Sequence, residues 1–203
     1  MNMNNISRDI VLTDGKVKIL PHGPEYMDHV YAAVMESRAE IMPWMGWMHP
    51  GYDMHDTRLW LESRHEAWAN GTDYAFAILD AQDDSFLGNC GLNHIDRDSR
   101  FANLGYLIRT SQTRRGAATA AARLVAGFGF DTLKMVRLEI VVSTGNKASQ
   151  RVAEKAGALR EGVWIRIAKR TNQYSESESE TGVESVVRIG ISVVCDTNTM
   201  RRS

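Results

Sequence analysis

The sequence predicts a single α/β (α+β) domain over residues 1–203, with a mixed, mostly antiparallel central sheet of about seven strands flanked by about four helices. Two observations predict this class. Three strand-like runs in the middle of the chain follow one another through short polar turns, which favours antiparallel neighbours. Further along, a helical run lies between two strand-like runs, and a strand–helix–strand unit of this kind requires a parallel pair.

The first half of the chain predicts one strand, two helices and the loops around them. In order, we expect a loose polar segment (1–14), a strand (Val17–Leu20), a helix (25–41), a loop (41–50) and a second helix (56–70). Two prolines and a glycine interrupt the aromatic, methionine-rich run at 41–50, which is why we expect a loop there. Gly71 ends the second helix, because glycine tolerates the left-handed backbone that is common at that position.

The second half of the chain holds most of the predicted sheet. We expect strands at Tyr74–Leu79, Phe86–Ile95, Phe101–Ile108, Arg137–Val142, Ala158–Lys169 and Val183–Val194, with helices from 116 to about 133 and over Asn146–Ala156. Alanine gives the longer helix a high propensity, and its small side chains allow close packing on a sheet. Residues 171–182 contain the repeat Ser-Glu-Ser-Glu-Ser-Glu and predict a solvated, flexible hairpin loop.

The composition argues against several classes of protein. Lysine and arginine total 24 against 25 aspartates and glutamates, so a nucleic-acid binder that works through bulk positive charge is not expected. No apolar run is long enough to span a bilayer, and residues 1–14 lack the apolar stretch of a signal peptide, so we expect a cytoplasmic protein. Cys90 and Cys195 each lie in an apolar strand-like run, and we interpret them as reduced core thiols rather than as a disulfide.

The first segment that indicates chemistry is the junction between the strand ending at Ile108 and the helix that follows. The first amides of a helix lack an internal acceptor and point outward, and the helix dipole adds positive potential, so a helix start can bind an anion. Arg114 and Arg115 add positive charge, while Gly116 and Ala118 leave room for a phosphate to approach the backbone. The alternative is a plain helix start with solvated arginines.

The second such segment is Val141–Gly162, where another strand leads into a helix. Asn146 occupies a natural N-cap position, and Ser149 lies one helical turn later, so both side chains are expected to face the same opening. The alternative is that Asn146 only caps the helix and that Ser149 has no role.

Together these segments resemble the GNAT superfamily of N-acetyltransferases, and most closely its branch of ribosomal-protein N-terminal acetyltransferases (RimJ/RimL-like). The family's cofactor loop, Q/R-x-x-G-x-G/A, is matched by Thr113–Ala121. The family's downstream pattern, N-x-x-S followed by E-K-x-G-A and E-G, is matched from Asn146 to Gly162. Met42-Pro43-Trp44 and Leu104-Gly105-Tyr106 also resemble that branch. Past Lys169 the likeness ends, because the Ser/Glu repeat stands where the family has a short polar turn.

The resemblance implies the GNAT fold and acetyl-CoA as the cosubstrate. The pantetheine arm would lie in a splay between two central strands, where the backbone of Leu107 and Ile108 would hold it and polarise the thioester. Arg109 would lie at the edge of the same splay. The residues implied to hold the pyrophosphate are Arg114, Arg115, Gly116, Ala117, Ala118 and Thr119, and those implied to complete the cofactor site are Asn146 and Ser149.

For catalysis, the resemblance implies that Ser149, with Asn146 beside it, meets the leaving sulfur, because Ala153 stands where many members have a tyrosine. The family often has a glutamate just before Leu-Gly-Tyr, and here that residue is Asn103, which cannot accept a proton. His94 is therefore the candidate base, directly or through a water molecule. Glu139 and an amine that arrives neutral are the alternatives.

On the acceptor side, the resemblance implies that Trp44 and Trp47 border the substrate together with Asn103, with Met45 and Met48 nearby. The alternative is that the tryptophans fill core between helices. His49 and His55 have no partners at metal-ligand spacing, so no metal site is expected.

The acceptor implied by the resemblance is a primary amine, foremost a protein or peptide N-terminus. An acetyltransferase for a small amine or an antibiotic is the second hypothesis. A non-catalytic acyl-CoA-binding module is the third, since Thr113, Ala120, Asn103 and Ala153 depart from the catalytic pattern. Dimers are common in the family, and an exposed final strand would be able to pair in a homodimer.

Overall fold

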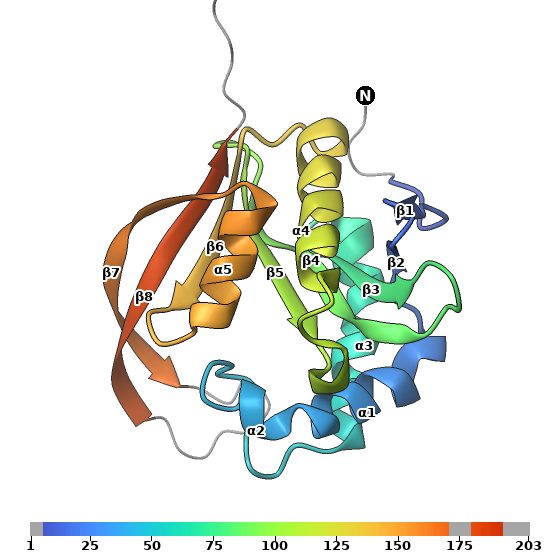
Figure 1. Ribbon diagram of the computed structural model, residues 1–203, viewed down its shortest axis with the longest axis horizontal. Helices are drawn as coiled ribbons and strands as arrows, with labels where there is room; N and C mark the ends of the chain where they lie inside the picture. Colours follow the sequence, from blue (N-terminus) through green and yellow to red (C-terminus); the bar gives the residue numbers. More distant parts are fainter. Residues whose placement is uncertain (1–5, 171–179, 193–203) are drawn as a thin grey trace, which may run out of the picture.

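The computed structural model describes residues 6–170 and 180–192, which form one eight-stranded sheet in the order β1-β2-β3-β4-β5-β6-β8-β7 (Figure 1). The strands are β1 (Leu12–Thr13), β2 (Val17–Pro21), β3 (Tyr74–Asp80), β4 (Phe86–Asp96), β5 (Phe101–Ile108), β6 (Arg137–Ser143), β7 (Leu159–Arg170) and β8 (Glu180–Ser192). All neighbours in this sheet are antiparallel except β5 and β6, which are parallel. The predicted mixed, mostly antiparallel sheet is confirmed, with the two-residue β1 in addition.

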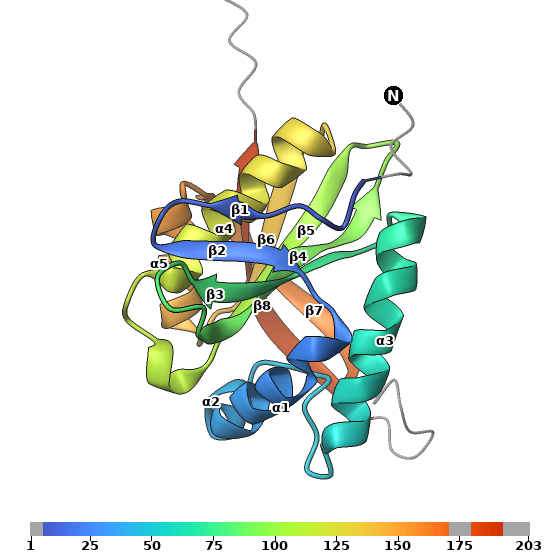
Figure 2. The same ribbon diagram turned by 90° about the vertical axis from the view of Figure 1, so that its right-hand side faces the viewer.

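Helices cover both faces of the sheet, which lies between two helical layers (Figure 2). One layer holds α4 (Ala117–Gly127) and α5 (Lys147–Ala156), and the other holds α1 (Met27–Glu36), α2 (Arg38–Ile41) and α3 (Met54–Asn70). Shorter helical turns are η1 (Pro24–Tyr26), η2 (Thr110–Gln112) and the π-helical η3 (Phe128–Thr132). We call the two sides of the sheet the α4–α5 face and the α1–α3 face.

Local sequence explains where the helices begin and end. Asp53 caps α3 by accepting from the amides of His55 and Asp56, and the Asp56 carboxylate accepts from the Asp53 amide in return. The same helix ends at Gly71, whose φ of 64° is left-handed, as expected from the sequence. Gly157, with φ 105°, ends α5 in the same way.

Two predicted helices differ in detail from the structure. The helix expected over 25–41 is divided into η1, α1 and α2, with a break at Ser37. The helix expected to reach about 133 is α-helical only to Gly127 and continues as a π-turn to Thr132, where Gly127 and Gly129 lower the helix propensity.

The N-terminal segment is better packed than the sequence predicts. Ile6, Ile10 and Leu12 pack against the main hydrophobic cluster, and the Trp68 indole donates a hydrogen bond to the Ile6 carbonyl at 2.9 Å. The expectation of a loose segment is therefore wrong for residues 6–14, because three apolar side chains find a surface that only the folded sheet provides. Most of the hairpin loop expected at 171–182 and Cys195 lie outside the described residues. Cys90 is a free, buried thiol, and burial raises its pKa.

The place where β5 and β6 stop pairing positions the candidate site. Phe101–Asn103 of β5 pair with Arg137–Glu139 of β6, and beyond these residues the two strands no longer pair. Strand β5 stays paired with β4 up to Ile108, and β6 stays paired with β8 up to Ser143. The sheet therefore opens into a splay between β5 and β6, which Figure 1 shows as two diverging ribbons. Within the described residues, no helix is long and apolar enough to cross a membrane.

Candidate active site

The turn before α4 has an unusual backbone. Arg114 has φ 64°, and Gly116, the N-cap of α4, has φ 86°. A β-carbon at Gly116 would meet nothing nearer than the Lys16 ammonium nitrogen, 3.9 Å away, so the backbone is open to a ligand. The amides of Ala117–Thr119 have no acceptor within the helix, and this combination suits an anion.

Exposed cations surround this turn. Arg114 and Arg115 are exposed, and a hollow lined by Lys16, Gln112, Arg115 and Ala117 adjoins the helix start. Lys16 is absent from the sequence-based site, because it comes from the turn before β2 and no local pattern connects it with α4. The residues of the predicted pyrophosphate loop thus lie together and fit a phosphate-bearing ligand.

The free edge of β5 corrects one expectation. The Arg109 amide donates to the Leu87 carbonyl of β4, and hydrogen-bonding direction alternates along a strand. Tyr106 and Ile108 therefore direct their backbone groups toward the splay, whereas Leu107 directs its own toward β4, where its carbonyl lies against Gly88. Ile108 is placed to hold an extended ligand, and Leu107 is not.

A pair of hydroxyl groups bridges the splay on the α4–α5 face. The Tyr106 hydroxyl of β5 donates to the Ser149 carbonyl of α5 at 2.9 Å and lies 3.0 Å from the Ser149 Oγ. Burial raises the pKa of Tyr106, which keeps the phenol protonated. The sequence did not indicate a role for the Tyr106 hydroxyl, because Tyr106 was identified only as part of the Leu104-Gly105-Tyr106 resemblance.

Asn146 acts first as a cap. Its Oδ1 accepts a hydrogen bond from the Ser149 amide at 3.0 Å, which fixes the first turn of α5 and with it the Ser149 hydroxyl. Ala153, where many relatives carry a tyrosine, is fully buried in the core. The structure therefore brings Ser149 and Asn146 together, as predicted, and adds Tyr106.

Arg109 is paired with an acidic residue of α1. Its guanidinium forms a two-nitrogen ion pair with Glu36 at the end of α1, with Nε at 2.8 Å from Glu36 Oε2. The Ser111 amide donates to the other Glu36 oxygen at 2.6 Å, and the Thr110 amide donates to the Ser37 Oγ at 2.9 Å. In this structure Arg109 fastens the β5–α4 loop to α1, and its place at the edge of the splay stays a prediction.

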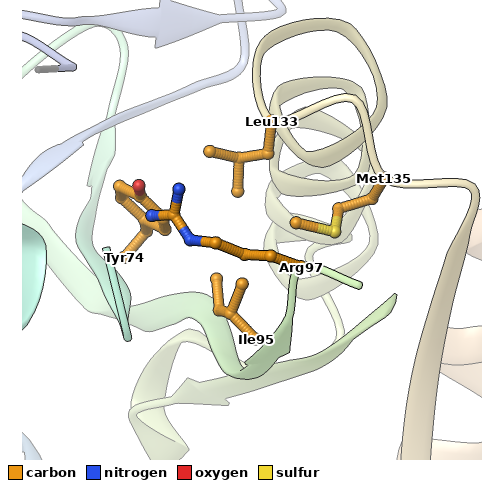
Figure 3. Close-up of a pocket in the computed structure, with 5 residues that line it drawn as sticks. All are labelled: Tyr74, Ile95, Arg97, Leu133 and Met135. Carbon is orange, nitrogen blue, oxygen red and sulfur yellow. The ribbon is translucent and has the colours of Figure 1, made fainter. Parts of the chain in front are cut away.

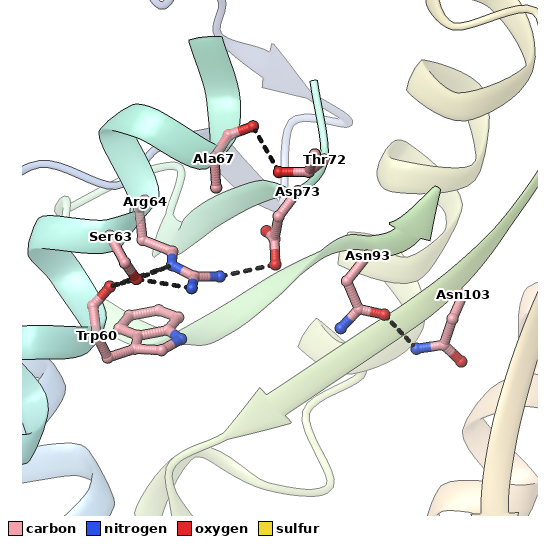
Figure 4. Close-up of polar contacts among 8 residues, drawn as sticks. All are labelled: Trp60, Ser63, Arg64, Ala67, Thr72, Asp73, Asn93 and Asn103. Atoms are coloured by element: carbon pink, nitrogen blue, oxygen red, sulfur yellow. Dashed lines mark hydrogen bonds and ion pairs between the residues drawn. The ribbon is translucent and has the colours of Figure 1, made fainter. Parts of the chain in front are cut away.

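A row of polar side chains crosses the α1–α3 face (Figure 4). The Asn103 amide of β5 donates to the Asn93 carbonyl oxygen of β4 at 2.7 Å, and Asp73, just before β3, accepts from Arg64 at 2.7 Å. Burial raises the pKa of Asp73, and the Arg64 charge opposes that shift. In Figure 4 the Asn103 carbonyl oxygen points away from Asn93, so it is free to accept a further hydrogen bond.

Neither candidate base lies free in the splay. Glu139, opposite Asn103 on β6, is 7 % exposed and is held by Arg188 Nε at 2.9 Å, with Arg137 at 3.8 Å. His94 lies at a register irregularity of β4 with φ 48°, and its side chain is exposed. Since Asn93 lies level with the paired end of β5 and β6, His94 is not brought together with Ser149. The role of His94 as a base, directly or through a water molecule, stays a prediction.

The two tryptophans of the 41–50 loop differ. Trp44 is 38 % exposed, and a β-carbon at Gly145 would lie 3.0–3.1 Å from its ring, so the indole rests on the β6–α5 loop. Trp47 packs against the α1–α3 cluster, with its ring 5.7 Å from that of Tyr52, and Met48 is buried there. Trp44 therefore borders the splay. Trp47 is partly buried against the core between the helices, which agrees with the alternative stated for the tryptophans.

A second hollow has no part in this arrangement. It is lined by Tyr74, Ile95, Arg97, Leu133 and Met135 and lies near the far end of α4 (Figure 3). The Arg97 side chain crosses it toward Tyr74. Within the described part of the chain, no three His, Cys, Asp or Glu side chains are grouped to hold a metal ion.

Comparison with known proteins gives the family. Residues 17–159 match the acetyltransferase (GNAT) domain family, and this chain therefore belongs to the GNAT acetyltransferases, as the sequence resemblance predicts. Proteins of this family use acetyl-CoA, and the open helix start beside the β5–β6 splay fits such a ligand.

Similar proteins support the same family assignment. The probable N-acetyltransferase YjcK of Bacillus subtilis is 34 % identical over 113 residues, which cover 55 % of this chain and 62 % of YjcK, so the match spans less than two thirds of that relative. Among solved structures, RimL, the ribosomal L7/L12 alpha-N-protein acetyltransferase, in complex with CoA, has a TM-score of 0.76 at 14 % identity, covering 90 % of this chain and 98 % of RimL. The microcin C7 self-immunity acetyltransferase MccE with acetyl-CoA and AMP has a TM-score of 0.76 at 18 % identity, covering 89 % and 94 %. At these identities the two structures show the shared fold.

Proposed function

We propose that this chain transfers the acetyl group of acetyl-CoA to a primary amine, foremost the α-amine of a protein or peptide, by direct attack within a ternary complex. The observation that carries the proposal is the β5–β6 splay with a hydroxyl pair, Tyr106 and Ser149, at its edge and an open helix start at Gly116 beside it. The pyrophosphate is held by Arg114–Thr119, with Lys16 close enough to add charge.

The chemistry requires the amine to attack the thioester carbonyl carbon, the C–S bond to break and the leaving thiolate to gain a proton. Ser149 supplies that proton and takes one in turn from Tyr106 through their 3.0 Å contact. The proton that the attacking nitrogen loses on forming the amide leaves through water and restores Tyr106. Asn146 holds the serine in place through its cap. The Ile108 backbone, directed into the splay, holds the pantetheine arm and orients the thioester.

The acceptor arrives already neutral, because Asn103 carries no proton-accepting charge and Glu139 is occupied by arginines. Asn103 Oδ1 accepts a hydrogen bond from the amine and orients its lone pair. An α-amine has a pKa of about 7.7–8.0 against about 10.4 for lysine, so near pH 7.5 its neutral fraction is larger by about two orders of magnitude. This favours an N-terminal α-amine, in keeping with the acceptor named for RimL.

A second candidate, a small-molecule amine, is favoured by the exposed Trp44 indole at the splay. An aromatic border suits a compact ligand, whereas an open acidic groove would suit a peptide, and the described acidic groups nearby are paired with arginines. MccE and the spermidine N(1)-acetyltransferase of Escherichia coli, 27 % identical over 117 residues, are relatives named for other acceptors or roles.

The test is release of free CoA by the purified protein with acetyl-CoA and three acceptors: short peptides with free N-termini, spermidine and an aromatic monoamine. We expect turnover with the peptides and a rate that rises with pH through the pKa of the α-amine. A preference for spermidine or the aromatic monoamine would favour a small-molecule amine over a peptide N-terminus as the acceptor. Binding of acetyl-CoA without turnover on any amine would instead support a non-catalytic binding module.

A further inference from the structure

We infer that Glu36 and Ser37, on the acceptor side of the molecule, are positioning residues for acetyl-CoA, which they never touch. This inference rests on the proposed function. The two residues end α1 and fasten the segment 109–111, which joins the strand proposed to hold the pantetheine arm to the loop proposed to hold the pyrophosphate.

The attachment has several independent bonds. Glu36 receives the Arg109 guanidinium on one oxygen and the Ser111 amide on the other, at 2.6 Å. Ser37 is 1 % exposed and uses its hydroxyl oxygen to accept from the Thr110 amide at 2.9 Å. Three consecutive residues of the loop are thus held by the last residue of α1 and the residue that follows it, which lie far away in the sequence.

The charges agree with a fastening role. The Arg109 hydrogen bond, helped by the Ser111 amide, lowers the pKa of Glu36 to about 2, so the carboxylate is ionised at all neutral pH values. Arg109 is neutralised by this pair and is drawn toward α1. Arg109 and Thr110 directly follow Ile108, so the fastening fixes where β5 ends and where the turn to Gly116 begins.

The same attachment links the two substrates. Helix α2 and the loop that carries Trp44 follow Ser37 directly. A shift of the α1–α2 junction would therefore move the cofactor loop and the acceptor border together, which makes this junction the place where the two sites can influence each other.

An electrostatic role and a positioning role of Glu36 predict opposite changes in CoA affinity, so a measurement can distinguish the two roles. Glu36 bears the same sign as the cofactor phosphates, so removing its charge should strengthen binding if only electrostatics matters. Removing a fastening should weaken it. Ser37→Ala removes one bond without any change of charge and so tests position alone.

The experiment measures CoA binding by calorimetry and the KM for acetyl-CoA for wild type, Glu36→Gln, Glu36→Ala and Ser37→Ala. Glu40→Gln is the matched control, since Glu40 is exposed on α2 and carries the same charge. We expect Glu36→Ala to weaken CoA binding about tenfold, the order expected for lost charge-assisted hydrogen bonds, with kcat changed by less than about threefold. Glu36→Gln and Ser37→Ala should weaken it less, and Glu40→Gln should leave it unchanged.

Hydrogen exchange of the amides in 109–119 gives a second readout that does not depend on activity. Faster exchange in Glu36→Ala and Ser37→Ala, with the global unfolding temperature retained, supports the inference. If wild type binds CoA and the Glu36 variants bind equally well or better, the inference is wrong and the proposed function stands. If wild type does not bind CoA, the proposed function fails and the inference falls with it. Should Glu36→Ala not fold, Glu36→Gln and Ser37→Ala decide.

Discussion

The proposed cofactor side and acceptor side of the splay consist of different kinds of chemical group. On the proposed cofactor side the groups are backbone amides at the start of α4, small residues around Gly116 and one capped serine, all within two short stretches of chain. On the acceptor side they are side chains from β4, β5, β6, the α2 loop and α3, most of which are already paired with one another. A site made of backbone leaves a local pattern in the sequence, whereas a site made of distant side chains does not.

The largest expected effect tests the cofactor side. Gly116→Glu forces a side chain onto a residue with φ 86° and places a carboxylate where the phosphates are proposed to bind. We expect CoA affinity to fall by more than about 100-fold, since both strain and like charge oppose binding. Calorimetric titration with CoA measures the change. Gly46→Glu, at an open position with ordinary φ, is the control and should bind normally. Retained binding in Gly116→Glu would refute the placement of the pyrophosphate.

The next effect tests the hydroxyl pair between the two sides. Ser149→Ala should lower kcat by about 100-fold, the lower end of the range usual for a lost proton donor, with the KM for acetyl-CoA nearly unchanged. Tyr106→Phe should lower kcat by less, and the double variant should be no slower than Ser149→Ala, because the two groups act in series. Ser99→Ala, in the exposed β4–β5 turn, serves as the control. Additive losses would show that the two hydroxyls act separately.

The third prediction tests the acceptor side by comparing kcat/KM for amines of different size. Trp44→Ala opens the border of the splay and should raise kcat/KM for bulky amines relative to slender ones by about tenfold, the discrimination that a small change in a pocket supplies. Gly145→Ala should also change this ratio, because its new methyl group would lie 3.0–3.1 Å from the indole and displace it. CoA binding should stay the same in both. If both variants lower kcat/KM for every amine alike, Trp44 has no role in selecting the acceptor.

The last prediction concerns stability on the acceptor side rather than binding or turnover. His22 is 1 % exposed, and burial lowers its pKa from 6.5 to about 3, so the folded protein holds it neutral. The unfolded chain binds a proton below pH 6.5, so this group's share of stability is complete above that pH and is lost as the pH falls toward about 3, with a slope of up to about 1.36 kcal/mol per pH unit.

Urea unfolding between pH 7 and pH 4 measures that slope. His22→Gln, which cannot gain a proton there, should flatten the curve by the contribution of one proton, whatever its effect at pH 7. His55→Gln, at an exposed position of α3, should leave the slope as in wild type. An unchanged slope in His22→Gln would show that the ring is protonated in the folded state as well.

The sequence by itself determined the sheet, its parallel β5–β6 pair and the helix ends at Gly71 and Gly157, and it predicted the proposed cofactor loop. These features depend on periodicity, on glycine at left-handed positions and on spacing along a continuous stretch, which are local properties. It also indicated Ser149 and Asn146, because a cap and the residue one turn later share a helix face.

Only the tertiary structure decided the rest. Tyr106 contacts Ser149, Lys16 approaches Gly116, and Glu36 pairs with Arg109 because sheet order and helix packing bring together residues that are far apart in the chain. The alternation of β5 directs the backbone groups of Ile108 rather than those of Leu107 toward the splay, and a register irregularity lies at His94. Such outcomes depend on which neighbour each strand pairs with and on which face each side chain is directed to, and no single stretch of sequence contains that information.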